Sequence, residues 1–216
     1  MWTNVLRANV AKVVIELRRY LPNTISMFVT FYVIFLAMLL GVTVVGDPAA
    51  MDQNVRFLLV GNAVWFLLLG GINSIGWEVT TEATRGTLEQ LHMSPVAARW
   101  ILLARLVGNL ATNLVIVGLM LLASMATTRT WLAVDLPFLA AVLVPMLLAV
   151  AGLAFAVAGL AVVYKQVQAM LQISQFVFLA MAFVPLATAP WLELAPAVKG
   201  IDMLRASLVD GAGFAA

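Results

Sequence analysis

Five long apolar stretches dominate the 216-residue chain. Backbone groups inside a bilayer must satisfy their own hydrogen bonds, so a run of about 20 apolar residues predicts a spanning helix. The expected spans are 24–45, 55–76, 101–126, 137–163 and 169–189. The sequence therefore predicts an all-α integral membrane protein, folded as a polytopic helical bundle.

The composition fits a bilayer and argues against several kinds of soluble protein. Hydrophobic residues make up 64% of the chain and charged residues 10%, whereas a soluble domain carries about 25% charged residues. The chain has no cysteine and one histidine, His92, so we expect no metal site and no catalytic residue. Its basic residues are scattered, so we expect membrane lipids, and no nucleic acid, as partners.

The distribution of charge predicts the orientation of the spans. If the N-terminus is cytosolic, eight of the twelve Lys and Arg side chains lie on the cytosolic side and six of the ten acids lie on the other. An excess of Lys and Arg in cytosolic loops is the usual pattern. We therefore expect a multi-pass protein of the cell membrane, inner or plasma, with a cytosolic N-terminus.

Residues 1–22, before the first span, predict an amphipathic interfacial helix. Six apolar residues share one helical face: Leu6, Val10, Val13, Val14, Leu17 and Leu21. The other side carries five charged residues: Arg7, Lys12, Glu16, Arg18 and Arg19. Such a helix can lie along the cytosolic leaflet. A cytosolic helix packed on a partner protein is the alternative, and the two are compatible.

Residues 77–99, between the second and third spans, form a polar segment. Four of its charged residues follow at steps of four, three and four: Glu78, Glu82, Arg85 and Glu89. On a continuous helix they would form one stripe, in which Arg85 can pair with Glu82 and Glu89. The spacing predicts a helix that continues out of the membrane.

The same segment also contains signals that end one helix and start another. Gly86 weakens the first helix, and Thr87 can begin a short second one as its N-cap, with Gln90 completing a capping box. Leu88 and Leu91 give the short helix an apolar face. The pattern is compatible with a solvated linker or with an element that docks into a soluble partner.

Residues 82–95 follow the pattern Glu-x-x-x-Gly-Thr-Leu-Glu-x-Leu-x-x-Ser-Pro. This pattern resembles the cytosolic segment of type-2 ATP-binding-cassette (ABC) exporter permeases, and the span order agrees over nearly the whole chain. The resemblance implies a transmembrane subunit that pairs with a second permease copy, as a homodimer or with a close paralogue, on two ABC ATPase subunits. It implies a coupling helix at 86–91. The ATPase-coupling residues expected from it are Glu78, Glu82, Arg85, Gly86, Thr87, Leu88, Glu89, Leu91, Ser94 and Pro95.

The chain itself is not expected to be an enzyme. It contains no G-x-x-x-x-G-K-[ST] run for phosphate binding. We therefore expect ATP and Mg on the separate nucleotide-binding subunit and no cofactor bound by this chain. The expected function is export of an amphipathic, lipid-like, drug-like or glycan substrate by alternating access. A non-transport membrane scaffold and an ATP-independent channel or secondary carrier are the alternatives.

The C-terminal part departs from the family pattern. The family usually has six spans, and this sequence predicts five, so we expect that a sixth is missing, with a true five-span variant as the alternative. Residues 190–213 carry too many charges for a span and predict short external helices. The apolar residues expected to face lipid or protein are Val198, Ile201, Leu204 and Leu208. The charged residues expected to face water are Lys199, Asp202 and Arg205.

Polar and aromatic residues inside the spans are candidates for the substrate pathway. They are Asn62, Trp65, Phe66 and Asn73 in the second span, Asn109 and Asn113 in the third, and Gln172 and Gln175 in the fifth. Buried amides favour interior faces, where they can contact substrate or bond a neighbouring helix. No charged residue lies deep in a predicted span, which disfavours proton- or sodium-coupled transport. In the fourth span, Gly152, Ala156 and Gly159 predict close helix packing.

Overall fold

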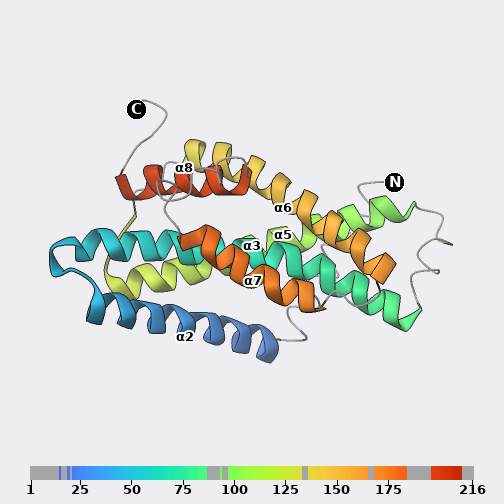
Figure 1. Cartoon of the computed structure of the whole chain (residues 1–216), viewed down its shortest axis with the longest axis horizontal. Helices are drawn as coiled ribbons and strands as arrows, with labels where there is room; N and C mark the ends of the chain where they lie inside the picture. Colours follow the sequence, from blue (N-terminus) through green and yellow to red (C-terminus); the bar gives the residue numbers. More distant parts are fainter. Residues whose placement is uncertain are drawn as a thin grey trace.

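Every regular element in the described part of the computed structural model is a helix. The structure describes residues 15, 19, 21–86, 93, 97–132, 136–164, 168–183 and 196–210. The elements follow in the order α2 (Leu21–Val45), η1 (Pro48–Ala50), α3 (Met51–Arg85), α5 (Ala98–Thr128), α6 (Leu136–Tyr164), α7 (Gln168–Phe183) and α8 (Pro196–Asp210). The expected all-α bundle is confirmed (Figure 1).

Four helices are long and apolar enough to cross a membrane. Their spans are Thr24–Val45, Pro48–Asn73, Trp100–Thr128 and Pro137–Leu160, which confirms four of the five expected segments. The fifth segment forms α7, which has 16 residues and a length of about 24 Å, short of a hydrocarbon core of about 30 Å. The rest of that expected span, 184–189, lies outside the described residues.

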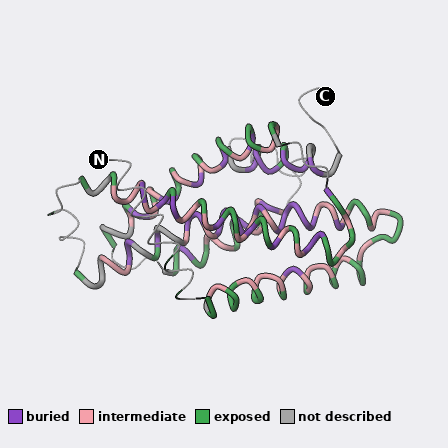
Figure 2. The backbone as a smooth tube through the Cα atoms, turned by 180° about the vertical axis from the view of Figure 1, so that it is seen from behind, coloured by how far each residue is buried: buried purple, intermediate pink, exposed green. Residues whose placement is uncertain are grey.

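Helix α3 is the centre of the bundle and packs against α2, α5, α6, α7 and α8. In an 18-residue stretch of its span, 72% of the residues are buried. The corresponding share for α2, which lies at the edge of the bundle, is 6% (Figure 2). Helix α2 is attached through Phe31, whose ring centroid is 4.1 Å from that of Phe66 on α3, and through Tyr32, whose hydroxyl lies 2.5 Å from that of Thr127 on α5. The chain is thus built around its second span.

Glycines on α3 allow its neighbours to approach closely. A Cβ atom added at any of four positions would come within about 3 Å of another helix: Gly61 and Gly76 against α7, Gly70 against α5 and Gly71 against α6. Small residues let helix backbones approach within a membrane, where packing and hydrogen bonds replace the hydrophobic effect. The central position of α3 therefore depends on these glycines.

The expected close packing at Gly152, Ala156 and Gly159 of α6 is wrong within this chain. A Cβ atom at either glycine would meet no heavy atom within 4 Å, and all three residues are exposed. The buried side of α6 is instead the one that carries Ala154 and Ala158, which lie in the core. The glycines that allow close helix packing lie on α3, where they were not expected from the sequence.

Most of the expected interfacial helix at 1–22 lies outside the described residues. Ile15 and Arg19 are described, and both are helical and exposed. Helix α2 begins at Leu21 with Pro22 in its first turn, where a proline costs no backbone hydrogen bond. The interfacial helix itself stays a prediction.

Helix α8 lies within 190–213, where a short helix was expected, and the expected external position of this segment stays a prediction. Its apolar residues Val198, Ile201, Leu204 and Leu208 are buried, and Lys199 and Asp202 are exposed. The helix packs against α6, α3 and α7. Arg205, expected to face water, is only 7% exposed, so that assignment is wrong.

Candidate functional site

Helix α3 extends well beyond its membrane span into the polar segment. Its 35 residues give a length of about 52 Å, against about 30 Å of hydrocarbon. The span ends near Asn73, and the helix continues for three more turns to Arg85. Glu78, Glu82 and Arg85 therefore lie on one continuous helix that leaves the span, as the stripe spacing predicted.

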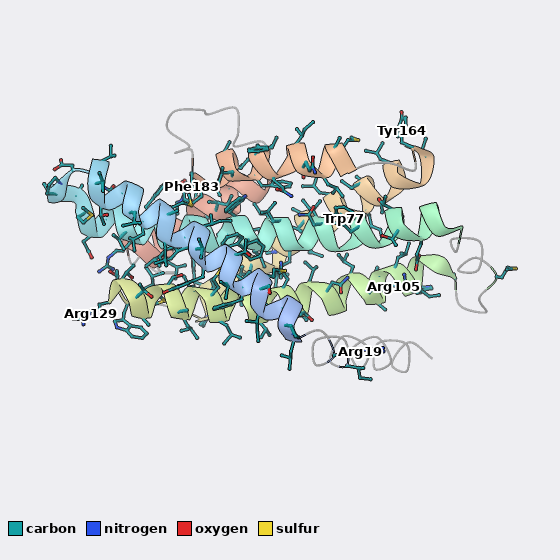
Figure 3. All side chains as sticks on the ribbon, turned by 90° about the horizontal axis from the view of Figure 1, so that it is seen from below. Arg19, Trp77, Arg105, Arg129, Tyr164 and Phe183 are labelled. Atoms are coloured by element: carbon teal, nitrogen blue, oxygen red, sulfur yellow. The ribbon has the colours of Figure 1, made fainter. Side chains whose placement is uncertain are left out.

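The described part of the polar segment contains an ion pair between two helices. Glu82 on α3 accepts a hydrogen bond from Arg105 on α5, with 2.7 Å between Oε1 and Nη1. The two side chains are 20% and 17% exposed, so water screens the pair only in part. Arg105 lies toward the end of the bundle opposite to Arg129 and Phe183 (Figure 3). The pair thus joins the two helices that border the polar segment, close to where it leaves the bundle.

Sequence reasoning did not find Arg105 as a partner of Glu82. It considered pairs along one helix, of Arg85 with Glu82 and with Glu89. The side chains of Arg85 and Glu89 lie outside the described part of the structure. Arg105 follows residue 101, the expected start of the third span, by about one turn. The usable signal was that α3 and α5 are consecutive and antiparallel, which brings the end of one beside the start of the other.

Gly86 ends α3 as the sequence predicted. Its φ of 70° is in the left-handed region, and its N–H donates to the carbonyl oxygen of Glu82. A glycine adopts this conformation without the steric penalty that a Cβ atom brings, which makes it the common residue at a helix C-terminus. Residues 87–92 and 94–96, which contain the rest of the expected coupling residues, lie outside the described part.

Asn113, a candidate pathway residue, is part of the contact between α3 and α5. Its Nδ2 donates to the carbonyl oxygen of Leu67 at 2.9 Å, and its side chain fills the space above Gly70. The residue is 8% exposed. These contacts occupy its amide in helix packing, which was the alternative reading for the buried amides.

Two other candidates connect α3 with α7. The Nε1 of Trp65 donates to the backbone carbonyl of Gln175 at 3.3 Å. The ring of Phe66, next to it on α3, is buried and stacks on Trp65 and Phe31. Gln175 is half-buried and Gln172 is exposed. The structure brings Trp65, Phe66 and Gln175 together, and Gln172 lies outside this cluster on the exposed side of α7.

Two of the remaining amide candidates have a side-chain oxygen without a hydrogen-bond partner among the described residues. Asn62 is buried and Asn73 is half-buried, and within the described residues the Oδ1 of neither has a hydrogen-bond partner. Asn109 is half-buried on α5. A buried carbonyl oxygen without a partner is unfavourable and is normally satisfied by water or a ligand. The role of these residues in a substrate pathway stays a prediction.

Arg205 ties α8 to two other helices. Its guanidinium carbon lies 3.9 Å from the centre of the Phe57 ring on α3, and its Nη2 donates to the carbonyl oxygen of Ala182 near the end of α7. A cation is favourable at the C-terminus of a helix and over an aromatic face. Burial lowers the pKa of Arg205 below its usual range, to about 10, while the charge of Asp202 opposes this shift. The side chain therefore remains a cation at neutral pH.

Comparison with known proteins agrees with this architecture. A family model described as ABC-2 family transporter protein matches residues 46–206, about three quarters of the chain. The match includes α3, α5, α6, α7 and most of α8. No curated protein and no solved structure matches the chain. Because the family model covers well over half of its length, the chain belongs to the ABC-2 family of transporter proteins and is a multi-pass membrane permease of ABC type.

Proposed function

We propose that the chain is the transmembrane subunit of an ATP-driven exporter, coupled to a separate ABC ATPase through the polar segment. The ATPase binds and hydrolyses ATP with Mg, and the permease works as a homodimer or with a close paralogue. The N-terminus and the polar segment are cytosolic. The cargo is amphipathic, lipid-like, drug-like or glycan in nature, and alternating access moves it outward.

The observation that carries this proposal is the Glu82–Arg105 pair across α3 and α5. The described residues on the two sides of the expected coupling helix are Gly86 at the end of α3 and Ala97 at the start of α5. An ion pair between these helices near that point makes both ends of the coupling segment move together. A push on the segment would then shift α3 and α5 as a unit.

The packing of α3 supports transmission of such a push into the bundle. Helix α3 contacts every other described spanning helix, and its glycines hold α5, α6 and α7 at close range. A close-packed interior is stiff and transmits displacement rather than absorbing it. Movement of the Gly86 end of α3 would therefore displace the helices that surround the candidate pathway residues.

The proposal is tested by reconstituting the permease with its ATPase in liposomes and measuring ATP hydrolysis and ATP-dependent efflux of a fluorescent amphipathic dye. We expect Glu82→Gln to lower efflux per ATP hydrolysed while the complex still assembles. Asp52→Asn removes an exposed acid on the same helix and serves as the matched control. Efflux that continues without the ATPase would overturn the proposal, and an unchanged ratio of efflux to hydrolysis in Glu82→Gln would remove the ion pair from it.

A further inference from the structure

A cavity of about 460 Å³ lies between α2 and α3, at the end of the bundle where these two helices are connected (Figure 1). Its walls come from positions within 38–46, from positions within 54–58, and from Phe183 at the end of α7. The volume lies within the range of about 300–1,000 Å³ that is typical of small-molecule sites. No charged residue of the described part lines it. The cavity therefore suits an uncharged and mainly apolar ligand.

The cavity runs along the membrane span, from its end toward its middle. Gly46 directly follows the α2 span, Thr24–Val45, so this part of the wall lies at the boundary of the hydrocarbon. Met38 is eight residues earlier, or about 12 Å deeper along α2. Phe183 reaches a similar depth, because its Cε1 would lie 2.8 Å from a Cβ atom added at Gly61 of α3. The long axis of the cavity is thus that of the surrounding lipid chains.

The polar side chain of the wall lies at the boundary end. Asn54 is half-buried, and its Nδ2 lies 3.6 Å from the Cβ position of Gly46. The ion pair of Asp52 with Arg56 flanks it on α3, as expected at the headgroup level, since charged side chains avoid hydrocarbon. Within the described residues the Asn54 side chain forms no hydrogen bond. Its amide is therefore available to a ligand at this level.

The cavity is open on the lipid side of α2. Gly41 and Val45 of its wall are exposed, and α2 lies at the edge of the bundle. The helix is attached to its neighbours through Phe31 and Tyr32, about two turns before the cavity begins at Met38. Empty apolar space is unfavourable, because the atoms that line it lose packing contacts. A hydrocarbon chain from the bilayer can supply those contacts.

We propose that the α2–α3 cavity binds a membrane phospholipid through one of its acyl chains. The chain packs on Met38, Phe57 and Phe183, and the Asn54 amide donates to the ester carbonyl. An amide at the boundary and apolar residues deeper down match a lipid, whose esters lie at the boundary and whose chains run to the midplane. A spanning helix of a second copy would instead place apolar side chains along the whole cavity. The site requires neither nucleotide nor cargo, so it stands apart from the proposed function.

The test uses the full chain in phosphatidylcholine nanodiscs with a phosphatidylcholine that carries a photoreactive diazirine in its acyl chain. Labelled residues are identified by mass spectrometry after irradiation. We expect label on Leu58, which lines the cavity but is only 3% exposed. Lipid that merely surrounds the bundle would label exposed residues such as Leu119 and leave Leu58 unlabelled, and this result overturns the proposal.

Filling the cavity should abolish the label on Leu58. Gly41→Phe places a ring in the wall, and Gly41→Leu is a milder change. A Cβ atom at Gly41 meets no heavy atom within 4 Å, so neither variant clashes at that atom. Gly118→Phe on α5, an equally open glycine of a spanning helix, is the matched control and should leave Leu58 labelled. Label that survives both Gly41 variants overturns the proposal.

A pair of lipids tests the hydrogen bond of Asn54. Ester-linked phosphatidylcholine has the carbonyl oxygens that the amide can bond, and ether-linked phosphatidylcholine lacks them. In competition against the label on Leu58, the ester lipid should be favoured by about fivefold, an effect typical of one hydrogen bond between neutral groups. Asn54→Leu should remove this preference, and Asp52→Asn should keep it. Equal competition by the two lipids in the unmodified chain overturns the role of Asn54.

Two further measurements distinguish the phospholipid from other occupants. The amphipathic dye of the efflux measurement should leave the label on Leu58 unchanged, and displacement of the lipid by the dye would make the cavity a cargo site. Met38→Cys should form no disulfide between copies, and such a disulfide would show that a second copy covers the cavity. Either result overturns the proposal. The labelling needs no ATPase, so failure of the proposed function would leave it unaffected.

Discussion

Glu82 at the end of α3 and Arg105 near the start of α5 are joined by a 2.7 Å hydrogen bond between Oε1 and Nη1. The two residues are 23 positions apart, and residues 83–99 of the polar segment lie between them. Charge-assisted bonds of this length are stronger than bonds between neutral groups. The pair therefore links α3 and α5 on either side of residues 83–99 and fixes the spacing between these two helices.

We expect a double-mutant cycle of Glu82→Gln and Arg105→Gln to give a coupling free energy of about 1–2 kcal/mol. This is below the effect of about 3–5 kcal/mol for breaking a fully buried pair, because both side chains are partly exposed. Thermal unfolding of the detergent-solubilised variants measures the coupling. The exchanged pair, Glu82→Arg with Arg105→Glu, should recover part of the loss.

The salt bridge of Asp52 with Arg56 is the matched control for this cycle. It lies on the same helix at 2.9 Å, but its side chains are 72% and 31% exposed. Exposed pairs at this helical spacing contribute about 0.3–0.5 kcal/mol. Equal coupling in the two pairs would show that the position of Glu82 and Arg105 between two helices has no energetic consequence.

Replacement of Gly86 by alanine should destabilise the end of α3 by about 1 kcal/mol, because its φ of 70° disfavours a Cβ atom. No heavy atom lies within 4 Å of the added Cβ, so the penalty comes from the backbone and not from a clash. Gly86→Asn should lose less, since asparagine tolerates this region. Circular dichroism during thermal unfolding measures the change. Gly41→Ala, at an open helical position, is the control, and an equal effect of the two alanines would contradict the argument.

Features that depend on one segment could be predicted from the sequence. Hydropathy located the four long spans because each helix must satisfy its own backbone groups. The end of α3 at Gly86 was found because a left-handed C-terminus is a local property of glycine. Features that depend on the register of two helices could not be predicted. The Glu82–Arg105 pair and the contact of Asn113 with Gly70 need the relative position of α3 and α5, which single-helix spacing does not contain.

Arg205 was misplaced for a different reason. Its side was assigned from its charge, although it follows Val198 by seven positions and Ile201 by four, which puts it on the buried side of α8. The position of Arg205 around the helix indicated burial correctly, but the assignment followed the charge of the side chain instead. A buried arginine needs partners, and the carbonyl of Ala182 and the ring of Phe57 provide them.

Gly70→Ala should destabilise the α3–α5 contact by about 1–3 kcal/mol, the usual range for overpacking. The added Cβ would come within 2.2–2.4 Å of the Asn113 amide and displace it from the carbonyl of Leu67. Gly118→Ala on α5 is the matched control, because nothing lies within 4 Å of its Cβ position and alanine is the better helix former by about 1 kcal/mol. Thermal unfolding should fall for the first variant and not for the second. The reverse order would contradict the packing described for α3.

Arg205→Met should loosen α8 and lower stability by about 1–3 kcal/mol, through loss of the bond to Ala182 and the contact with Phe57. Limited proteolysis within 184–210 and thermal unfolding measure this, with Lys199→Gln as the exposed control on the same helix. The folded-state pKa of about 10 lies below the pKa of an arginine in the unfolded chain, so burying the charge is unfavourable at any pH below 10 and is relieved only as the pH rises above 10. The Arg205 contribution should therefore be constant between pH 6 and 8, and a change there would contradict this account.

The proposed orientation predicts which residues a reagent reaches from outside the cell. The chain has no cysteine, so single cysteines can be introduced without background labelling. Asp47 precedes the second span and Met93 lies within the polar segment, and both are exposed. Because α3 spans the membrane between them, the two positions must lie on opposite sides. A membrane-impermeant maleimide should label Asp47→Cys and not Met93→Cys in intact cells, and the pattern should reverse in inside-out vesicles. Labelling of Met93→Cys from outside would place the polar segment away from any cytosolic ATPase, and ATP-driven coupling through that segment would then be impossible.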